Sequence, residues 1–256
     1  EIKRGEFVAI IGHTGSGKST LVQMFNGLLH PDQGTITLDD INLQNKTNEA
    51  KIAAKKVGMV FQYPEQQLFS ETVYEDVAFA PRNKGLANDE IDKAVRDALQ
   101  FVNLDFETFS GRNPLNLSGG QMRRVAIAGI IAMNPDYLIL DEPSAGLDPK
   151  GRKELFKEII NLHNKKQISI ILVTHSMEEA AAYAQRLLVL DKGKIVLDGK
   201  PQDLFINERE KLLALGLGEP AIYKLTNELK THGLNLEQPN NFADLVAKIK
   251  QAKGWH

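Results

Sequence analysis

The chain has 256 residues, a length that accommodates one α/β domain with a small appendage. Its formal net charge is −2, from 31 basic and 33 acidic residues, so no charge excess favours nucleic acid or a membrane surface as a partner. Because the sequence contains no cysteine, disulfides, thiolate metal sites and a cysteine nucleophile are excluded together.

The apolar segments are short and rich in β-branched residues, and they alternate with amphipathic helical patterns. This alternation is typical of a largely parallel sheet covered by helices. We expect strands at 7–11, 57–61, 137–140 and 168–173, an apolar helix at 21–29, a small hairpin of 35–38 around Asp39 and Asp40, and a hairpin joining 186–190 to 194–197 in which Gly193 supplies a positive φ. The apolar segments are far shorter than the roughly 20 residues that cross a bilayer, and no signal segment is visible, so the chain is expected to be soluble by itself.

Helical signals replace the strand pattern between residues 63 and 112. Asn88 is predicted to cap a helix with an apolar stripe formed by Ile91, Val95, Leu99 and Val102. We therefore expect residues 63–112 to form a helical subdomain inserted into an α/β core of residues 1–62 and 113–205. Charged amphipathic patterns beyond residue 205 predict a C-terminal helical extension over 206–256, with an apolar stripe at Phe242, Leu245, Val246 and Ile249.

A glycine-rich segment follows the first strand directly and precedes an apolar helix. It matches the phosphate-binding pattern G-x-x-x-x-G-K-[ST] in full, through Gly12, His13, Thr14, Gly15, Ser16, Gly17, Lys18 and Ser19, with Thr20 completing the expected nucleotide site. The glycines allow backbone N–H groups to turn inward around a polyphosphate, and the helix N-terminus adds partial positive charge. We expect Lys18 to reach the β- and γ-phosphate oxygens and Ser19 to ligate Mg²⁺. The alternative, a plain glycine-rich turn, is disfavoured by this position between strand and helix.

Two carboxylates follow the apolar segment 137–140. Strand ends of this kind face the ligand crevice in a doubly wound sheet, so Asp141 and Glu142 should emerge beside the phosphate loop. Asp141 is predicted to hold Mg²⁺ through water, and Glu142 to orient and polarise the attacking water. An isolated acidic pair after a strand is more often a solvated strand end. The presence of Lys18 in the phosphate loop favours the catalytic interpretation instead.

A second anion site is predicted at residues 118–121. Ser118 is expected to cap a long apolar helix that continues to Met133, which exposes the amides of Ser118, Gly119, Gly120 and Gln121. Because one triphosphate cannot usefully occupy both sites of one chain, the second site is predicted to bind the nucleotide held by another subunit. A serine-capped helix without a ligand is the alternative, and it would be preferred in the absence of the other motifs.

These motifs together resemble the ABC ATPase family of P-loop NTPases, over a span from residue 6 to about residue 205. GHTGSGKST at 12–20 resembles its Walker A motif, LSGGQ at 117–121 its signature and LILDEP at 138–143 its Walker B motif. The resemblance implies that Gln62 is the Q-loop glutamine, which contacts Mg²⁺, and that His175 is the switch histidine at the γ-phosphate. It also implies that SAGLD at 144–148 is the D-loop, which runs along the dimer interface.

One family feature is missing from the motif set. The family carries an aromatic residue that stacks on adenine in a strand before the segment where this chain begins. Adenine recognition is therefore assigned to no residue here, and we expect that strand to lie upstream of residue 1.

Within the family, QYPEQQLF at 62–69 and LSGGQMRRVAIAG at 117–129 resemble the ATPases of energy-coupling factor (ECF) transporters, which import vitamins and transition-metal ions. DEPSAGLDPKGR at 141–152 and the helical tail agree with this. The resemblance implies a peripheral location on the cytoplasmic face of the cell membrane. The implied partners are a second ATPase subunit, expected to be a paralogue that forms a heterodimer, a transmembrane coupling subunit and a substrate-binding membrane subunit, with no nucleic acid.

Other functions stay open at this point. The serious alternative is an ATPase of an ABC importer or exporter outside the ECF group. Non-transport ABC ATPases separate their motifs by long coiled coils or carry two such domains in one chain, and this sequence has neither architecture. A P-loop small-molecule kinase would lack both LSGGQ and the D-loop.

Overall fold

The computed structural model describes residues 1–237, 239 and 242–255. Its main sheet has six strands, β1 (Phe7–Ile11), β4 (Val57–Val60), β5 (Tyr137–Asp141), β6 (Ser169–Val173), β7 (Arg186–Asp191) and β8 (Lys194–Gly199). They are ordered β4-β5-β6-β1-β7-β8, with parallel pairing from β4 to β7 and an antiparallel pair β7–β8. The expected α/β fold with a parallel sheet is confirmed. β1 has the expected ends, and the other strands differ from the expected ranges by one or two residues.

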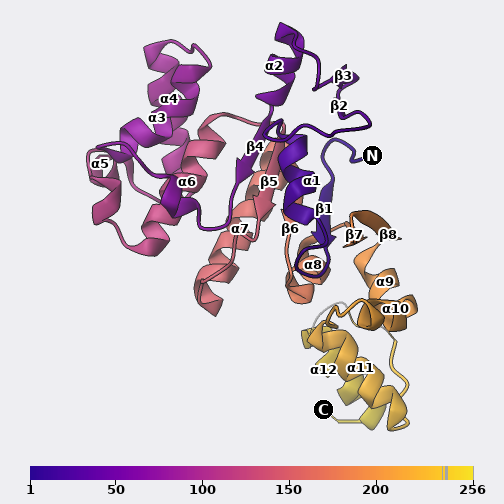
Figure 1. Ribbon diagram of the computed structural model, residues 1–256. Coiled ribbons are helices and arrows are strands. Elements are labelled where there is room, and N and C mark those ends of the chain that lie inside the picture. Colours follow the sequence, from indigo (N-terminus) through magenta and orange to yellow (C-terminus); the bar gives the residue numbers. More distant parts are fainter. Residues whose placement is uncertain (238, 240–241, 256) are drawn as a thin grey trace.

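Both faces of the sheet are covered, which explains why its strands read as continuous apolar segments instead of alternating ones. Phe7, Ala9 and Ile11 of β1 belong to a cluster that includes Phe156 of α7 (Pro149–Lys166) and residues of α8 (Met177–Tyr183). The opposite face packs against Val22 of α1 (Lys18–Phe25). The sheet is therefore held between helices, and its carboxyl edge is left for the site (Figure 1).

A group of helices lies beside the sheet (Figure 1). It contains η1 (Pro64–Gln67), α3 (Val73–Asn83), α4 (Asn88–Phe101), α5 (Phe106–Phe109), η2 (Pro114–Asn116) and α6 (Gly119–Ala132). The apolar stripe of α4 is buried as expected, and α6 packs against both α3 and α4. The subdomain limits of 63–112 stay a proposal, because α6 joins this group from beyond residue 112.

Two helix ends differ from the expectation. The first helix spans Lys18–Phe25 instead of 21–29, because the phosphate loop leads directly into it and Gly27, at φ 78°, turns the chain away. Asn88 is not the N-cap of α4. Ala87 holds that position, and its N–H donates to Oε2 of Glu90 at 3.0 Å, which replaces the capping that Asn88 was expected to provide.

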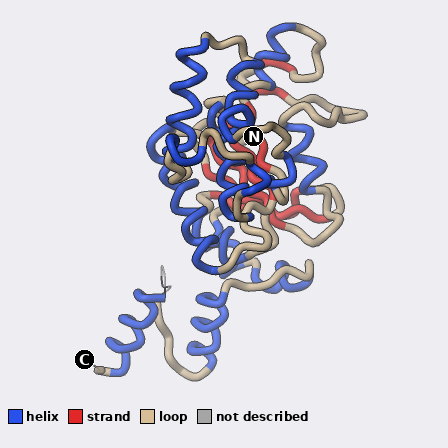
Figure 2. Tube along the Cα trace, turned by 90° about the vertical axis from the view of Figure 1, so that its left-hand side faces the viewer, coloured by secondary structure: helices blue, strands red, loops and turns tan. Residues whose placement is uncertain are grey.

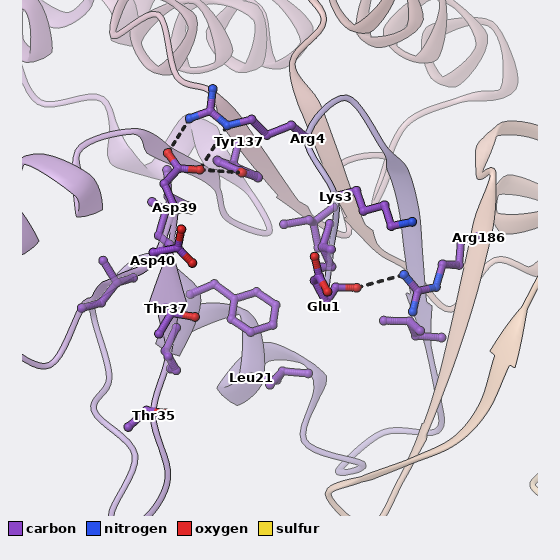
Figure 3. Close-up of a pocket in the computed structure, with 18 of the residues that line it drawn as sticks. Glu1, Lys3, Arg4, Leu21, Thr35, Thr37, Asp39, Asp40, Tyr137 and Arg186 are labelled. Carbon is purple, nitrogen blue, oxygen red and sulfur yellow. Dashed lines mark hydrogen bonds and ion pairs between the residues drawn. The ribbon is translucent and has the colours of Figure 1, made fainter.

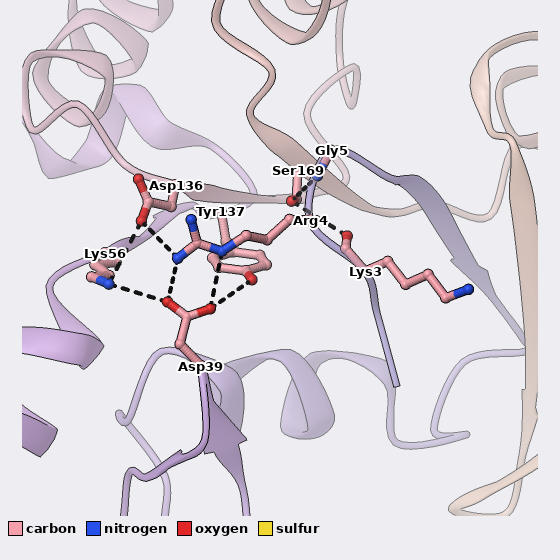
Figure 4. A network of polar contacts seen from close by, with 8 residues as sticks. All are labelled: Lys3, Arg4, Gly5, Asp39, Lys56, Asp136, Tyr137 and Ser169. Carbon is pink, nitrogen blue, oxygen red and sulfur yellow. Dashed lines mark hydrogen bonds and ion pairs between the residues drawn. The ribbon is translucent and has the colours of Figure 1, made fainter.

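The small antiparallel pair is confirmed, although its strands β2 (Thr37–Leu38) and β3 (Ile41–Asn42) are shorter than expected. Asp39 and Asp40 both have positive φ, at 49° and 64°, as the tight two-residue turn requires. The side chain of Asp39 pairs with Arg4, accepts from Nζ of Lys56 at 3.1 Å and lies 3.4 Å from the hydroxyl of Tyr137 (Figure 4). This network fastens the small sheet to the start of β5. The short helix α2 (Asn48–Ala54) follows.

Helices follow β8 to the end of the described chain. They are α9 (Pro201–Asn207), α10 (Arg209–Ala214), α11 (Ala221–Thr231) and α12 (Phe242–Lys253). α9 packs on β7, β8 and α8, whereas α11 and α12 contact each other and project from one end of the molecule (Figure 2). The extension is helical as expected, and its start at residue 206 stays a proposal because α9 already begins at Pro201. Among the described residues, no helix combines the length and the apolar character needed to span a membrane.

Candidate active site

The carboxyl ends of three neighbouring strands bring the predicted site residues together. The phosphate loop follows β1, Asp141 ends β5, and His175 follows β6, which lies between β1 and β5 in the sheet. Ligands of open α/β sheets bind at this edge. The order of the strands therefore brings segments that lie far apart in the sequence to the same edge of the sheet.

The phosphate loop is tightly packed at its base. A Cβ on Gly12 would lie 2.3 Å from the carbonyl oxygen of Leu190 and 2.6 Å from Oγ of Ser16. Gly15 and Gly17 have φ of 83° and 100°, values that L side chains rarely adopt. The carbonyl of Ser16 accepts the N–H of Gly193 at 2.9 Å, so the turn between β7 and β8 supports the loop.

The loop's exposed residues differ in their contacts. Nε2 of His13 lies 2.9 Å from Oδ1 of Asp191, and a hydrogen bond to the carbonyl of Thr14, followed by the bond to Asp191, raises the pKa of His13. Ser16 is buried, and its Oγ has no hydrogen-bond partner among the described residues. Thr14, Gly15, Ser19 and Thr20 face solvent. The exposed residues of the loop are therefore accessible to a ligand.

The ammonium group of Lys18 is held inside the loop. Its Nζ donates to the carbonyl of Gly12 at 2.7 Å and to that of His13 at 3.0 Å, and the residue is 8% exposed. Burial lowers the pKa of Lys18, while the carboxylates of Glu142 and Asp141 raise it. Burial is the larger effect, so the pKa is lowered overall, and the two carboxylates partly offset it. An ammonium group at this position can neutralise a polyphosphate.

Asp141 and Ser19 provide an oxygen donor set. Asp141 is 7% exposed, and burial raises the pKa of its carboxyl, while the hydroxyl of Ser19 donates a hydrogen bond to it and lowers the pKa. A carboxylate and a hydroxyl suit Mg²⁺, which is usually bound by one or two carboxylates together with substrate phosphates. These residues therefore fit the ion predicted from the sequence.

Glu142 and His175 form an ion-pair contact at the same edge. Nδ1 of His175 lies 2.8 Å from Oε2 of Glu142, and their side chains are 73% and 21% exposed. Glu142 has a φ of 49°, a left-handed conformation that costs energy for a residue other than glycine. Its N–H donates to the carbonyl of Val173 at 2.8 Å, which stabilises this turn. The strained backbone directs the carboxylate to the histidine.

Gln62 is exposed and follows β4 after one intervening residue. In the described part of the chain, no hydrogen bond or ion pair joins it to Ser19 or Asp141. Tyr63, the next residue, has a φ of 58° and precedes η1. Gln62 thus lies in the segment between β4 and η1, and its predicted contact with the metal site stays a proposal.

The second predicted anion site begins α6. Oγ of Ser118 accepts the N–H of Gln121 at 3.3 Å, and Oε1 of Gln121 accepts the N–H of Ser118 at 3.0 Å, a reciprocal capping arrangement. A Cβ on Gly119 or Gly120 would meet nothing within 4 Å, so a ligand can approach this helix start. Figure 1 shows α6 in the group of helices beside the sheet, apart from α1. The two helix starts of one chain therefore lie apart.

One pocket of the described chain lies away from this edge of the sheet. Its lining includes Glu1, Arg4, Leu21, Asp39 and Arg186 (Figure 3). Arg4 and Arg186 mark the amino ends of the parallel strands, opposite the edge where ligands of such sheets bind. This pocket is therefore no part of the candidate site.

Comparison with known proteins now decides the family. A model described as ABC transporter matches residues 1–145. The energy-coupling factor transporter ATP-binding protein EcfA2 of Clostridium tetani is 53% identical, with 99% of this chain and 85% of that protein covered. EcfA2 of Bacillus subtilis is 48% identical, with 97% and 91% covered. The chain belongs to the ATP-binding proteins of energy-coupling factor ABC transporters.

Two solved structures agree with this family. One is cbiO1 from Clostridium perfringens, described as part of the ABC transporter complex cbiONQ, with a TM-score of 0.73, 40% identity and 89% of each chain covered. The other is the ATP-binding cassette MJ0796 in a dimeric post-hydrolysis state bound to ADP and Pi, with a TM-score of 0.69, 31% identity, and 78% of this chain and 88% of that one covered. As a member of this family, the protein binds ATP and hydrolyses it, and hydrolysis is coupled to transport. The small-molecule kinase and non-transport alternatives are thereby set aside.

The structure adds a contact between the candidate segments that the motifs did not reveal. Arg123 of α6 is 5% exposed, and its guanidinium lies 3.3 Å from Oε2 of Glu65 in η1 and donates to the carbonyl of Ala145 at 2.9 Å. It thus joins the signature helix, the segment after Gln62 and the D-loop segment 144–148. An arginine on the buried face of an apolar helix was the signal for this contact, but its partners are distant in the sequence.

Proposed function

We propose that this protein is the Mg²⁺-dependent ATPase subunit that powers uptake of a vitamin or a transition-metal ion through an energy-coupling factor importer. It would lie on the cytoplasmic face of the cell membrane and act in a heterodimer with a paralogous ATPase subunit. A transmembrane coupling subunit and a substrate-binding membrane subunit would complete the transporter. The relatives' names and the cbiONQ neighbour support this proposal.

The separation within one chain of the two helix starts that are predicted to bind anions is the observation that supports the mechanism. Lys18, with Gly12, Gly15 and Gly17, would bind the phosphates of one ATP, and Ser118 to Gln121 of the second subunit would close over its γ-phosphate. ATP would thereby join the two subunits. The dimeric ATP-binding cassette bound to ADP and Pi supports such an arrangement.

Ser19, Asp141 and Gln62 would hold Mg²⁺, which would neutralise charge on the β- and γ-phosphate oxygens. Gln62 follows β4, which pairs with β5, and a local movement of this segment would bring it toward Asp141. This movement would also shift η1 and the helical group. A movement caused by nucleotide binding would in this way be transmitted to the surface that contacts the membrane subunits.

Glu142 would orient and polarise the attacking water, and His175 would contact the γ-phosphate while holding the carboxylate of Glu142 in place. Their separation of 2.8 Å and the strained φ of Glu142 support these roles. Loss of the γ-phosphate would remove the contact with the second subunit and allow the dimer to open.

The segment Glu65 to Phe69 would receive a helix of the coupling subunit. Phe69 is 67% exposed and packs edge-to-face against Phe79, with ring centroids 5.0 Å apart. Glu65, at the start of this segment, binds the buried Arg123. An exposed aromatic pair beside an arginine-linked segment suits a partner that must both bind and transmit movement.

The catalytic assignment is tested by Glu142→Gln, which keeps the size of the side chain and removes its negative charge. We expect ATP hydrolysis to fall by at least about 100-fold because a positioned base contributes about 10² to 10⁴ in rate. ATP binding, measured with a fluorescent analogue, should persist. Hydrolysis at the normal rate would contradict the role of Glu142. Co-purification from native membranes, followed by mass spectrometry, tests the ECF partners against those of another importer or exporter.

A further inference from the structure

A third acidic residue, beside Asp141 and Glu142, is buried near the site and has no role in the mechanism above. Glu179 lies on α8 and is 3% exposed. A buried carboxylate is costly unless its oxygens are hydrogen-bonded or paired with a cation. The hydrogen-bond partners of Glu179 therefore indicate which role this buried carboxylate has in the structure.

The two carboxylate oxygens of Glu179 bind two different loops. Oε1 accepts the hydroxyl of Ser144 at 2.5 Å, and Oε2 accepts the hydroxyl of Thr174 at 2.7 Å. Ser144 opens the D-loop segment and is two residues beyond Glu142, while Thr174 immediately precedes His175. One side chain thus joins the two segments that carry the hydrolytic pair.

The neighbouring groups fix the direction in which the two hydroxyls donate to Glu179. Thr174 Oγ1 also accepts the N–H of Ser176 at 3.0 Å, so its proton is directed to Glu179. Arg152 of α7 lies 3.6 Å from Oε1, which partly balances the charge. The N–H of Glu179 donates to Oγ of Ser176 at 3.3 Å, which fixes the start of α8. Both hydroxyls therefore donate to one carboxylate that cannot easily shift.

We propose that Glu179 is a positioning residue for hydrolysis, which holds the D-loop segment and the loop of His175 in register so that Glu142 and His175 keep their 2.8 Å contact. The inference rests on the proposed roles of Glu142 and His175. Since the D-loop segment is also expected at the subunit interface, displacement of that segment by the second ATPase would be transmitted through Ser144 and Glu179 to His175.

The test substitutes Glu179 with glutamine, which has nearly the same shape but only one acceptor oxygen. One of the two hydroxyl protons then loses its acceptor, and the two loops can separate. We expect kcat for ATP to fall about 10-fold or more, because small misplacements of catalytic groups cost up to about 10² in rate. The KM and the affinity for ATP should stay within about twofold, since the side chain of Glu179 contacts Ser144, Thr174 and Arg152 and, among the described residues, forms no hydrogen bond with the phosphate loop.

The matched control is Glu158→Gln. Glu158 is a carboxylate on α7 that is 8% exposed and is bound by Asn103 at 2.8 Å, away from the site. We expect its substitution to leave kcat unchanged. A parallel fall of kcat in both variants would show that loss of any buried carboxylate has this effect and would overturn the proposal.

A second pair of variants covers the case in which Glu179→Gln does not fold. Thr174→Val removes the hydroxyl and should lower kcat about as much as Glu179→Gln, whereas Thr174→Ser keeps the hydroxyl and should restore most of the rate. Equal rates for Thr174→Val and the unmodified protein would overturn the proposal. In a Glu142→Gln background, Glu179→Gln should cause little further loss, and full additivity would likewise count against it.

The outcomes separate this inference from the proposed function. If Glu142→Gln abolishes hydrolysis but both Glu179→Gln and Thr174→Val retain the normal kcat, the inference alone is wrong. If Glu142→Gln hydrolyses ATP normally, the assignment of the base is wrong, whatever Glu179 does.

Discussion

Gly12 has no room for a side chain, because a Cβ would lie 2.3 Å from the carbonyl oxygen of Leu190 in β7. We expect Gly12→Ala to displace the phosphate loop, lower the free energy of unfolding by about 1 to 3 kcal/mol and weaken ATP binding at least about 10-fold. Urea denaturation and nucleotide titration measure these effects. Gly111→Ala, where nothing lies within 4 Å, is the control and should change neither quantity. Unchanged nucleotide affinity in Gly12→Ala would show that the loop base does not shape the site.

At the residue scale, the sequence allowed prediction of the groups that belong to local motifs. Lys18 and Ser118 were predictable because a helix start and its preceding loop are adjacent in the chain. Glu179 and Arg123 were not, because Ser144 lies 35 residues from Glu179 and Ala145 lies 22 residues from Arg123, so the fold brings these partners together. The contact of Glu142 with His175 was also beyond the sequence, since it depends on the left-handed backbone of Glu142.

At the element scale, Asp39 fastens the small β2–β3 sheet to the main one. The pKa of its carboxyl is lowered to about 2, chiefly by its hydrogen bond to Arg4 and then by Lys56, against a raising effect of burial. Because the folded-state pKa lies below the ordinary value of 3.8, the stabilisation is present above pH 4 and is lost as the pH falls toward 2.

We therefore expect Asp39→Asn to lower the free energy of unfolding by about 1 kcal/mol at pH 7, after allowance for solvent screening of the exposed Arg4 and Lys56. The difference should stay constant down to about pH 5 and shrink below pH 4, as measured by urea denaturation. Asp40→Asn is the control, since Asp40 forms no ion pair in the described part of the chain. A difference that does not shrink in acid would show that the charge of Asp39 is not responsible.

Elements with strong patterns were predictable, and their ends were not. The buried strands read as continuous apolar segments, and the stripe of α4 has helical spacing. The end of α1 depended on Gly27, and the cap of α4 on the reach of Glu90, so both were misplaced from the sequence. The packing of α6 with α3 and α4 required tertiary contacts across residues 73–132, which no local pattern contains.

At the scale of the whole molecule, the separation of the two helix starts that we propose to bind anions supports the proposed second subunit. Lys18 belongs to the sheet core, while Ser118 belongs to the lateral helices that also carry η1. A movement of those helices relative to the sheet would therefore bring the signature toward a nucleotide on the second subunit. It would at the same time move the surface around Phe69, where we place the membrane partner.

The most direct test is the mass of the Glu142→Gln protein by light scattering, with and without saturating MgATP, alone and mixed with its companion ATPase subunit. The account predicts association of two ATPase subunits that depends on ATP and disappears when Ser118→Arg is added, because the arginine would block the open helix start of α6. Gly111→Ala in the same background should have no effect. The shared nucleotide site would be contradicted if the Glu142→Gln protein stays monomeric with MgATP both alone and with its companion subunit. It would also be contradicted if the dimer still forms after Ser118→Arg is added.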